Sequence, residues 1–229
     1  MIRIARLATS LAAVGGLALS AAALGAQESS ATVMVAPFNV HEARGDSRDF
    51  AGAGTAIADL LGADLRAGGV RVVERAPTQR TVALQPRTRD GMVGRQGVTE
   101  AAKLLGAAHA VYGGFSADAA GNIRLDARVV NAGTGAVEFT ERLQGRGDDV
   151  VGMLHQLVAR LAAGMSVSLS GNSAPNASIP LRALVDYGKA LEALDRGDRA
   201  QARQLLESIV RDQPDFAPAR TALAATGNR

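Results

Sequence analysis

The chain has 229 residues, of which 25 are basic and 22 are acidic, and it contains no cysteine and no tryptophan. Without cysteine the fold has no disulfide and no thiolate metal site, so its stability depends on a hydrophobic core. A nucleic-acid-binding surface needs a clustered excess of positive charge, and a formal net charge of +3 argues against one. We therefore expect no nucleic-acid partner.

Residues 1–26 have the composition of a secretory signal peptide. Two arginines precede an apolar run rich in Ala and Leu, and small residues fit a cleavage site between Ala26 and Gln27. Cleavage would remove both arginines and lower the formal net charge from +3 to +1. A retained membrane anchor is the alternative, because the run approaches the length of a spanning helix. We expect an exported, periplasmic protein that is not a lipoprotein, since no cysteine follows the apolar run.

Residues 31–169 are predicted to form one domain in which helices and strands alternate before an antiparallel meander. The expected elements are a buried strand over 31–40, a helix over 50–67, a short strand over 70–74, a short helix over 99–105, three strands over 109–117, 122–131 and 137–143, and a helix starting at 148 or 149. This order predicts an α/β fold of the α+β type, a mixed five-stranded sheet with helices packed on it.

The meander carries the clearest pattern in the chain. Ile123, Leu125, Ala127 and Val129 alternate with charged side chains, which indicates a strand with one buried and one solvated face. Gly121-Asn122 stands at the first corner and Gly133-Thr134-Gly135 at the second, where hairpin turns require positive φ. This stretch supplies a sheet but no evident chemistry.

Residues 75–97 show little periodicity and include two prolines, so we expect a solvated loop. The alternative is a loop that contacts an anionic surface, such as lipid headgroups or a cell-wall polymer. The side chains that would make this contact are Arg80, Arg87, Arg89 and Arg95.

Residues 170–180 are rich in Ser, Asn and Pro and are predicted to be a linker. Residues 181–229 then form a small all-α module of three helical segments. Asp198 is predicted to cap the second of these helices, with Gln201 three residues further on.

Five motifs in the predicted domain, taken together, resemble a known family. They are V-x-V-A-P-F-N at 33–39, R-V-V-E-R at 71–75, A-A-K-L-L-G-A at 101–107, V-Y-G-G-F at 111–115 and V-V-N-A-G-T-G-A-V at 129–137. Their order is similar to that in the CsgG family of curli secretion proteins and related periplasmic lipoproteins, and more loosely to the TolB amino-terminal domain. The resemblance implies an exported, non-catalytic domain that assembles or works at the outer membrane. The lipid-bearing cysteine and the long inserted hairpins of the CsgG-type pore formers have no counterpart in this sequence.

Residues 181–224 resemble a tetratricopeptide repeat, through Gly197-Asp198 in the turn, Ala202 on the second helix and Pro214 at its end. A generic helical hairpin is the alternative. One repeat is short of the three that are normally needed, so the module must pack on the first domain, pair with a second copy or dock on a partner. The candidate partner-binding residues are Tyr187, Leu191, Leu194, Arg203 and Phe216.

The nearest approach to a catalytic motif is G-F-S-A-D around Ser116, one residue from a nucleophile elbow. Its serine is predicted to lie in or at the end of a strand that turns into another strand, which is the wrong context for that motif. His41, His109 and His155 are far apart in the sequence and match no metal-ligand spacing. We expect no cofactor and no metal.

The sequence thus favours an exported, non-enzymatic assembly or scaffold protein that binds envelope proteins or a second copy of itself. We expect a homo-oligomer with peripheral contact to the outer membrane. Two alternatives remain: an accessory subunit of an outer-membrane secretion or transport complex, and, more remotely, a serine hydrolase using Ser116.

Overall fold

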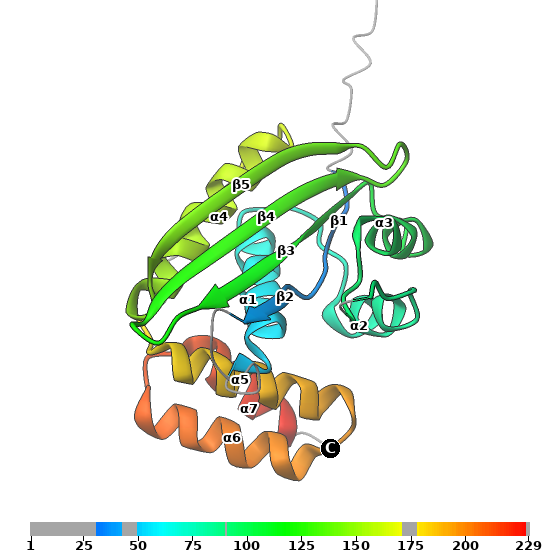
Figure 1. The fold of residues 1–229 in the computed structure, drawn as a ribbon. Helices are drawn as coiled ribbons and strands as arrows, with labels where there is room; N and C mark the ends of the chain where they lie inside the picture. The colour runs from blue at the N-terminus through cyan, green and yellow to red at the C-terminus, as the bar shows by residue number, and fades with distance from the viewer. Residues whose placement is uncertain (1–30, 43–49, 90, 171–177, 228–229) are drawn as a thin grey trace, which may run out of the picture.

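The structure is a computed structural model that describes residues 31–42, 50–89, 91–170 and 178–227 (Figure 1). Within them the elements are β1 (Val33–Val35), β2 (Asn39–Glu42), α1 (Ala53–Ala67), α2 (Arg75–Ala83), α3 (Arg95–Leu104), β3 (His109–Ala117), β4 (Asn122–Asn131), β5 (Val137–Arg146), the short 3-10 helix η2 (Gly147–Asp149), α4 (Val150–Gly164), α5 (Leu181–Asp195), α6 (Arg199–Asp212) and α7 (Ala217–Gly227). The predicted signal peptide and most of the predicted linker lie outside the described residues.

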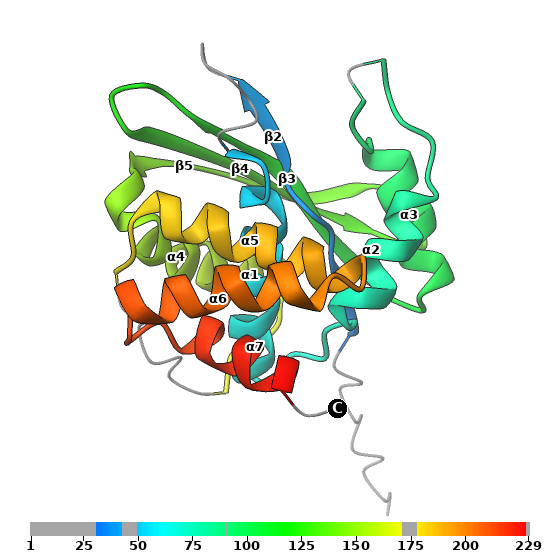
Figure 2. The same ribbon diagram turned by 90° about the horizontal axis from the view of Figure 1, so that it is seen from below.

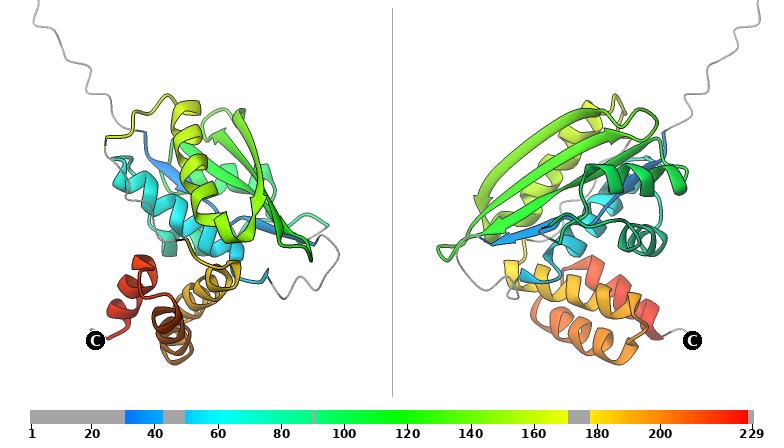
Figure 3. Two further views of the ribbon diagram at one scale, coloured as in Figure 1. Left: turned by 90° about the vertical axis from the view of Figure 1, so that its left-hand side faces the viewer. Right: turned by 45° about the vertical axis from the view of Figure 1, so that its right-hand side comes forward.

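The sheet is mixed, as the sequence predicted. β3, β4 and β5 form an antiparallel meander, while β1 and β2 both pair in parallel with β3 on its other side. The alternation in β4 is confirmed, because Ile123, Leu125, Ala127 and Val129 are all buried. They face α1 and α4, which cover one face of the sheet (Figures 1 and 3).

The single strand predicted over residues 31–40 is instead two strands. Pro37 lacks a backbone N–H and interrupts the ladder. From Val35 to Asn39 the chain advances four residues, while the paired positions on β3 advance only three, from Val111 to Gly114. The extra residue shifts the alternation of faces. As a result Asn39 lies on the sheet face opposite α1 and α4, where an unbroken strand would have turned it toward them.

Two other expectations for this region were wrong. Residues 70–74 form only an isolated bridge, Val33 to Val72, because the chain touches β1 briefly before it enters α2. Much of the predicted loop over 75–97 is helical. Pro77 lies in the first turn of α2, where its missing N–H has no intrahelical partner to lose. This helix was not predicted, because it buries only Thr78 and Val82 and so lacks an apolar stripe at helical spacing.

Helices α2 and α3 pack on the second face of the sheet. They form a smaller core with side chains from β1, β3 and β4, including Met34, Ala110 and Val130. This core covers the end of the sheet where β1 lies (Figure 1). No helix of the described residues packs on the other end of the same face (Figure 1). We call the face opposite α1 and α4 the outer face.

The C-terminal helices dock on α1 through α5, while α6 packs on α5 and α7 packs on α6 (Figure 2). The contact is closest where Gly188 of α5 meets Gly52, the N-cap residue of α1. A Cβ added to Gly188 would overlap the carbonyl oxygen of Gly52. One continuous core joins Ile57 and Leu61 of α1 with Leu184 and Phe216. The cap predicted at Asp198 is confirmed, since its Oδ1 accepts a hydrogen bond from the Gln201 N–H at 3.0 Å.

Candidate functional site

The uncovered end of the outer face presents two rows of residues, all of which carry polar side chains except Gly114. One row runs across four strands as Asn39, Gly114, Asp126 and Arg142, and the next runs as His41, Ser116, Arg124 and Gln144. We call these eight residues the open half-face. Because strand register fixes each row, the positions of these side chains are set by backbone hydrogen bonds along four neighbouring strands.

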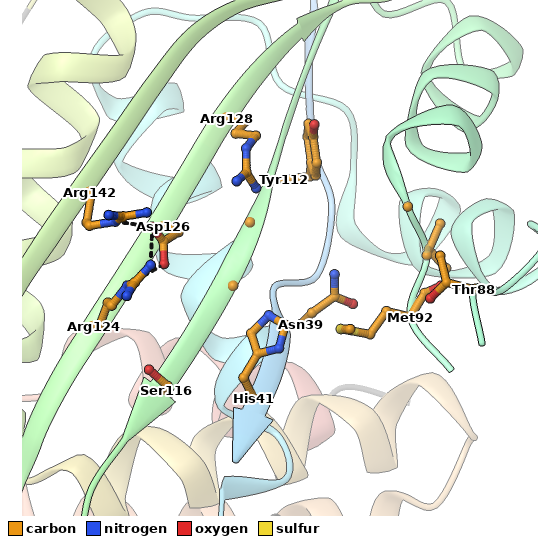
Figure 4. A pocket seen from close by; sticks show the side chains of 14 residues that line it. Asn39, His41, Thr88, Met92, Tyr112, Ser116, Arg124, Asp126, Arg128 and Arg142 are labelled. Atoms are coloured by element: carbon orange, nitrogen blue, oxygen red, sulfur yellow. Dashed lines mark hydrogen bonds and ion pairs between the residues drawn. The ribbon is translucent and has the colours of Figure 1, made fainter. Parts of the chain in front are cut away.

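A pocket of about 590 Å³ lies over most of these residues (Figure 4). Its second wall is the connection between α2 and α3, which contributes Thr88, Met92, Val93 and Gly94. Figure 4 shows Met92 and Thr88 across the pocket from the charged side chains of β4 and β5. The pocket therefore has a charged floor on the sheet and a partly apolar wall beside it.

Asp126 lies at the centre of the charged floor, between two arginines. Arg124 donates to both carboxylate oxygens, at 2.7 Å from Nε and 3.2 Å from Nη2, and Arg142 donates from Nε at 2.6 Å. Burial raises the pKa of Asp126, but the hydrogen bonds from Arg124 and Arg142 outweigh it and hold the pKa below its usual range. Asp126 is thus a carboxylate at neutral pH, and it fixes the orientation of both guanidinium groups.

A third arginine borders the pocket without any hydrogen bond to another described residue. The guanidinium carbon of Arg128 lies 6.0 Å from the centre of the Tyr112 ring, which is a cation–π arrangement. Burial raises the pKa of Tyr112, so its hydroxyl stays protonated at neutral pH. Three guanidinium groups and one carboxylate give this pocket an excess of positive charge.

His41 and Ser116 are brought together on neighbouring strands, as register partners that line the same pocket. The His41 ring lies over Gly114, where a Cβ would come within 2.7 Å of the ring Nε2. However, no hydrogen bond joins the described Ser116 and His41 side chains. The carboxylate of Asp126 is hydrogen-bonded to Arg124 and Arg142. Ser116 lies inside β3, in the strand context that the sequence predicted.

The other two histidines are elsewhere and are paired. His109 Nε2 lies 3.0 Å from Glu138 Oε2 on β5, and His155 Nδ1 lies 2.9 Å from Asp64 Oδ2 between α4 and α1. Burial raises the pKa of Asp64 and the charge of His155 opposes that shift. Among the described residues, no group of three or more His, Asp or Glu side chains has the arrangement of a metal site.

The predicted partner-binding residues of the C-terminal module are mostly engaged within the chain. Tyr187, Leu191 and Phe216 are buried, and the Tyr187 and Phe216 rings pack edge to face with centroids 5.2 Å apart. Leu194 is partly buried against the same core. Arg203 donates to the backbone oxygen of Thr226 at 3.0 Å. These contacts leave the open half-face as the better candidate for a binding surface.

The four arginines predicted to contact an anionic surface are exposed on α2, on the α2–α3 connection and at the start of α3. None of them lines the pocket over the open half-face. Arg87 lines a neighbouring pocket of about 420 Å³ that shares Asn39, Met92 and Val93 with the first. It also donates to the backbone oxygen of Gly91 at 2.7 Å, which braces the turn between α2 and α3. The role suggested for these arginines stays a prediction.

The cluster around Asp126 was not predicted from the sequence. The signal was present, because Arg124, Asp126 and Arg128 alternate on the charged face of the predicted strand. The position of Arg142 opposite Asp126 could not be found by counting residues across the β4–β5 turn, because the strand pairing shifts between Val129 and Val130.

No family model and no curated protein matches this chain. Among solved structures, it is similar to TolB from Acinetobacter baumannii, with 11% identity and a TM-score of 0.41 over 60% of this chain and 28% of that one. Lipoprotein GNA1162 from Neisseria meningitidis is 16% identical, with a TM-score of 0.40 over 61% of this chain and 99% of that one. The LpoB C-terminal domain from Escherichia coli is 17% identical, with a TM-score of 0.36 over 53% and 88%.

The chain thus spans less than a third of the TolB chain that it matches. All three TM-scores are below 0.5, and the likenesses assign neither a family nor an activity to this protein. The resemblances to the CsgG family and to a tetratricopeptide repeat stay predictions. No helix in the described ranges has both the length and the apolar character needed to cross a membrane.

Proposed function

We propose that this protein is an exported, non-enzymatic binding protein of the cell envelope, and that it holds a partner protein on the open half-face. The observation that carries the proposal is the pair Arg124 and Arg142 held by Asp126, with Arg128 lining the same pocket from β4. The export part of the proposal rests on the composition of residues 1–26.

The cluster is suited to binding because it is already ordered. Arg124 and Arg142 are held by Asp126, so less side-chain entropy is lost when a partner contacts them. Arg142 remains 57% exposed, and both of its terminal nitrogens are without an acceptor among the described residues. An ordered donor that still has free N–H groups is an effective recognition element, because arginine presents them in a rigid plane.

The same contacts support binding over chemistry. A serine nucleophile needs a base within hydrogen-bond reach and an acid that orients the base. In the described part of the chain, His41 has no hydrogen bond to Ser116, and the carboxylate that lines their pocket is bound to Arg124 and Arg142. The side chains are arranged as a charged surface.

The test is site-specific photocrosslinking in cells that express the full chain. Gln144, which is exposed on the open half-face, is replaced by a benzoylphenylalanine residue, and Arg211, exposed on α6, is replaced in a matched control strain. We expect a discrete adduct from position 144 that is absent from position 211. Adducts of the same size and yield from both positions, or none from position 144, would exclude a partner on this face.

The identity of the adduct separates the variants of the proposal. An envelope protein outside any export system supports a scaffold, and a component of a secretion complex supports the accessory-subunit alternative. An adduct between two copies of this chain supports self-association. Each of these occupants would be mapped from the crosslinked peptides by mass spectrometry.

A further inference from the structure

The free donors of the pocket specify what the partner must present. Arg128 makes no hydrogen bond to a described residue, and Arg142 uses only Nε. Arg128 is opposite Thr140 in the β4–β5 register, and Arg142 is opposite Asp126, so the two arginines are diagonal neighbours across the strands. Diagonal neighbours in a sheet are about 7–8 Å apart, a spacing that a carboxylate, or two carboxylates on one segment, can bridge.

The charge at the pocket favours an anion. Asp126 neutralises one of the three guanidinium groups, because its lowered pKa keeps it ionised. The two remaining positive charges have no acidic partner among the other described residues that line the pocket. Lining side chains from the facing elements are Asn39 and His41 on β2 and Thr88 and Met92 beside them, none of which carries negative charge.

The opposite wall of the pocket adds an apolar requirement. Met92 and Val93 line that wall, and the buried Tyr112 ring contacts Arg128 while it belongs to the core under α3. The pocket lies between the sheet and the α2–α3 connection, so a ligand in it would contact both walls (Figure 4). Its volume of about 590 Å³ lies within the range of sites that enclose small ligands or a few side chains.

We infer that the partner docks an acidic peptide segment, in which a carboxylate bound by Arg128 and Arg142 is followed by an apolar side chain that packs on Met92. This inference rests on the proposed function, and it adds the chemistry of the partner. An extended segment suits the site, because alternate side chains of an extended chain point the same way and would follow the rows of the sheet. Binding of the peptide segment involves no covalent step.

The test is a titration of the isotope-labelled full chain, followed by backbone amide shifts. The probe is an end-blocked peptide of alternating glutamate and leucine, and the matched probe replaces each glutamate by glutamine. We expect saturable shifts confined to Asn39, Met92 and the pocket-lining positions of β3–β5, with the glutamate peptide only. Raising the salt concentration should weaken this binding, because the exposed charges are screened.

Arg142→Gln and Arg128→Gln should each weaken binding of the glutamate peptide about tenfold, as expected when one charge-assisted hydrogen bond is lost. Arg182→Gln is the matched control, since Arg182 lies on α5 and is 92% exposed. Equal affinity for the glutamine peptide, or an equal loss in the Arg182 variant, would overturn the inference. So would binding of inorganic phosphate or phosphatidylglycerol vesicles at the same residues when the peptide does not bind.

Failure of this inference is distinguishable from failure of the proposed function. If position 144 gives its adduct in cells but the glutamate peptide does not bind, the partner occupies the face through other chemistry. If neither is observed, the open half-face is not the binding surface.

Discussion

Tyr187 of α5 donates a hydrogen bond to Asp59 of α1, with 2.8 Å between its hydroxyl oxygen and Oδ2. Burial raises the pKa of Tyr187, and the charge of Asp59 raises it further. Arg75, at the start of α2, lies 3.4 Å from Asp59 through Nε and also pairs with Asp195 at the end of α5. One polar network therefore joins the C-terminal helices to the sheet domain.

Tyr187→Phe should destabilise the protein by roughly 1.5–3 kcal/mol, because it removes a partly buried hydrogen bond to a carboxylate acceptor. The measurement is urea-induced unfolding followed by circular dichroism. Lys189→Gln, a change at a partly exposed position of the same helix, is the control and should have little effect. An unchanged unfolding midpoint for Tyr187→Phe would mean that the hydroxyl adds no stability to the contact between α5 and α1.

Gly188→Ala tests the close approach of α5 to α1. The added Cβ would overlap the Gly52 carbonyl oxygen, so the helices must separate, and we expect a loss of about 1–3 kcal/mol. Gly62→Ala is the matched control inside α1, where a Cβ would meet Arg66 and Val72 only at ordinary contact distances of 3.6 Å. This control should be neutral or stabilise by about 0.5–1 kcal/mol, since alanine favours helix. Equal stability of the two variants would refute the close packing.

The two contacts between α5 and α1, at Tyr187 and at Gly188, show what sequence patterns can and cannot predict. The helices of the C-terminal module were predictable, because Leu184 and Leu191 recur at helical spacing and Asp198 is a good N-cap. Their docking on α1 was not, because it depends on Gly52 and Gly188 meeting from positions far apart in the chain. Apolar periodicity shows that a face is buried and does not name the element that buries it.

In the sheet too, some features were predictable from the sequence and others were not. The meander was predictable because alternation and turn residues are local signals. The break between β1 and β2 was not predicted, because the run is apolar on both sides of Pro37 and reads as one buried strand. The candidate site depends on that break, since it turns Asn39 toward the pocket. Its charged floor also depends on the register that sets Arg142 opposite Asp126.

The ion pairs of Asp126 predict a pH dependence of stability. The pKa of Asp126 is lowered in the folded protein, so its contribution is fully present above the unfolded pKa of about 3.9. It is lost as the pH falls through the lower folded value. The difference in unfolding free energy between wild type and Asp126→Asn should therefore shrink as the pH is lowered from 6 toward about 2.

Urea unfolding of both proteins across this range measures the difference. Asp215→Asn, at an exposed position between α6 and α7, is the control for loss of an acidic side chain. A difference that stays constant or grows toward low pH would contradict the role of Asp126 as an ionised acceptor.

Ser116 should not react as an activated nucleophile, because no hydrogen bond links it to His41 in the described structure. A fluorophosphonate probe should leave the purified protein unlabelled under conditions that label a known serine hydrolase. Stoichiometric labelling that disappears in Ser116→Ala, and not in Ser168→Ala, would revive the hydrolase alternative. Ser168 follows α4 and is exposed, so it controls for nonspecific reaction.

The most direct test of the binding surface combines the crosslinker at position 144 with charge reversal at a neighbouring position. Arg142→Glu places a negative charge in the pocket, while Arg182→Glu makes the same change on α5. The measured quantity is the yield of the adduct in cells, normalised to the amount of exported protein. We expect Arg142→Glu to lower the yield at least tenfold and Arg182→Glu to leave it unchanged. An adduct of equal yield in both variants would contradict the placement of the partner on the open half-face.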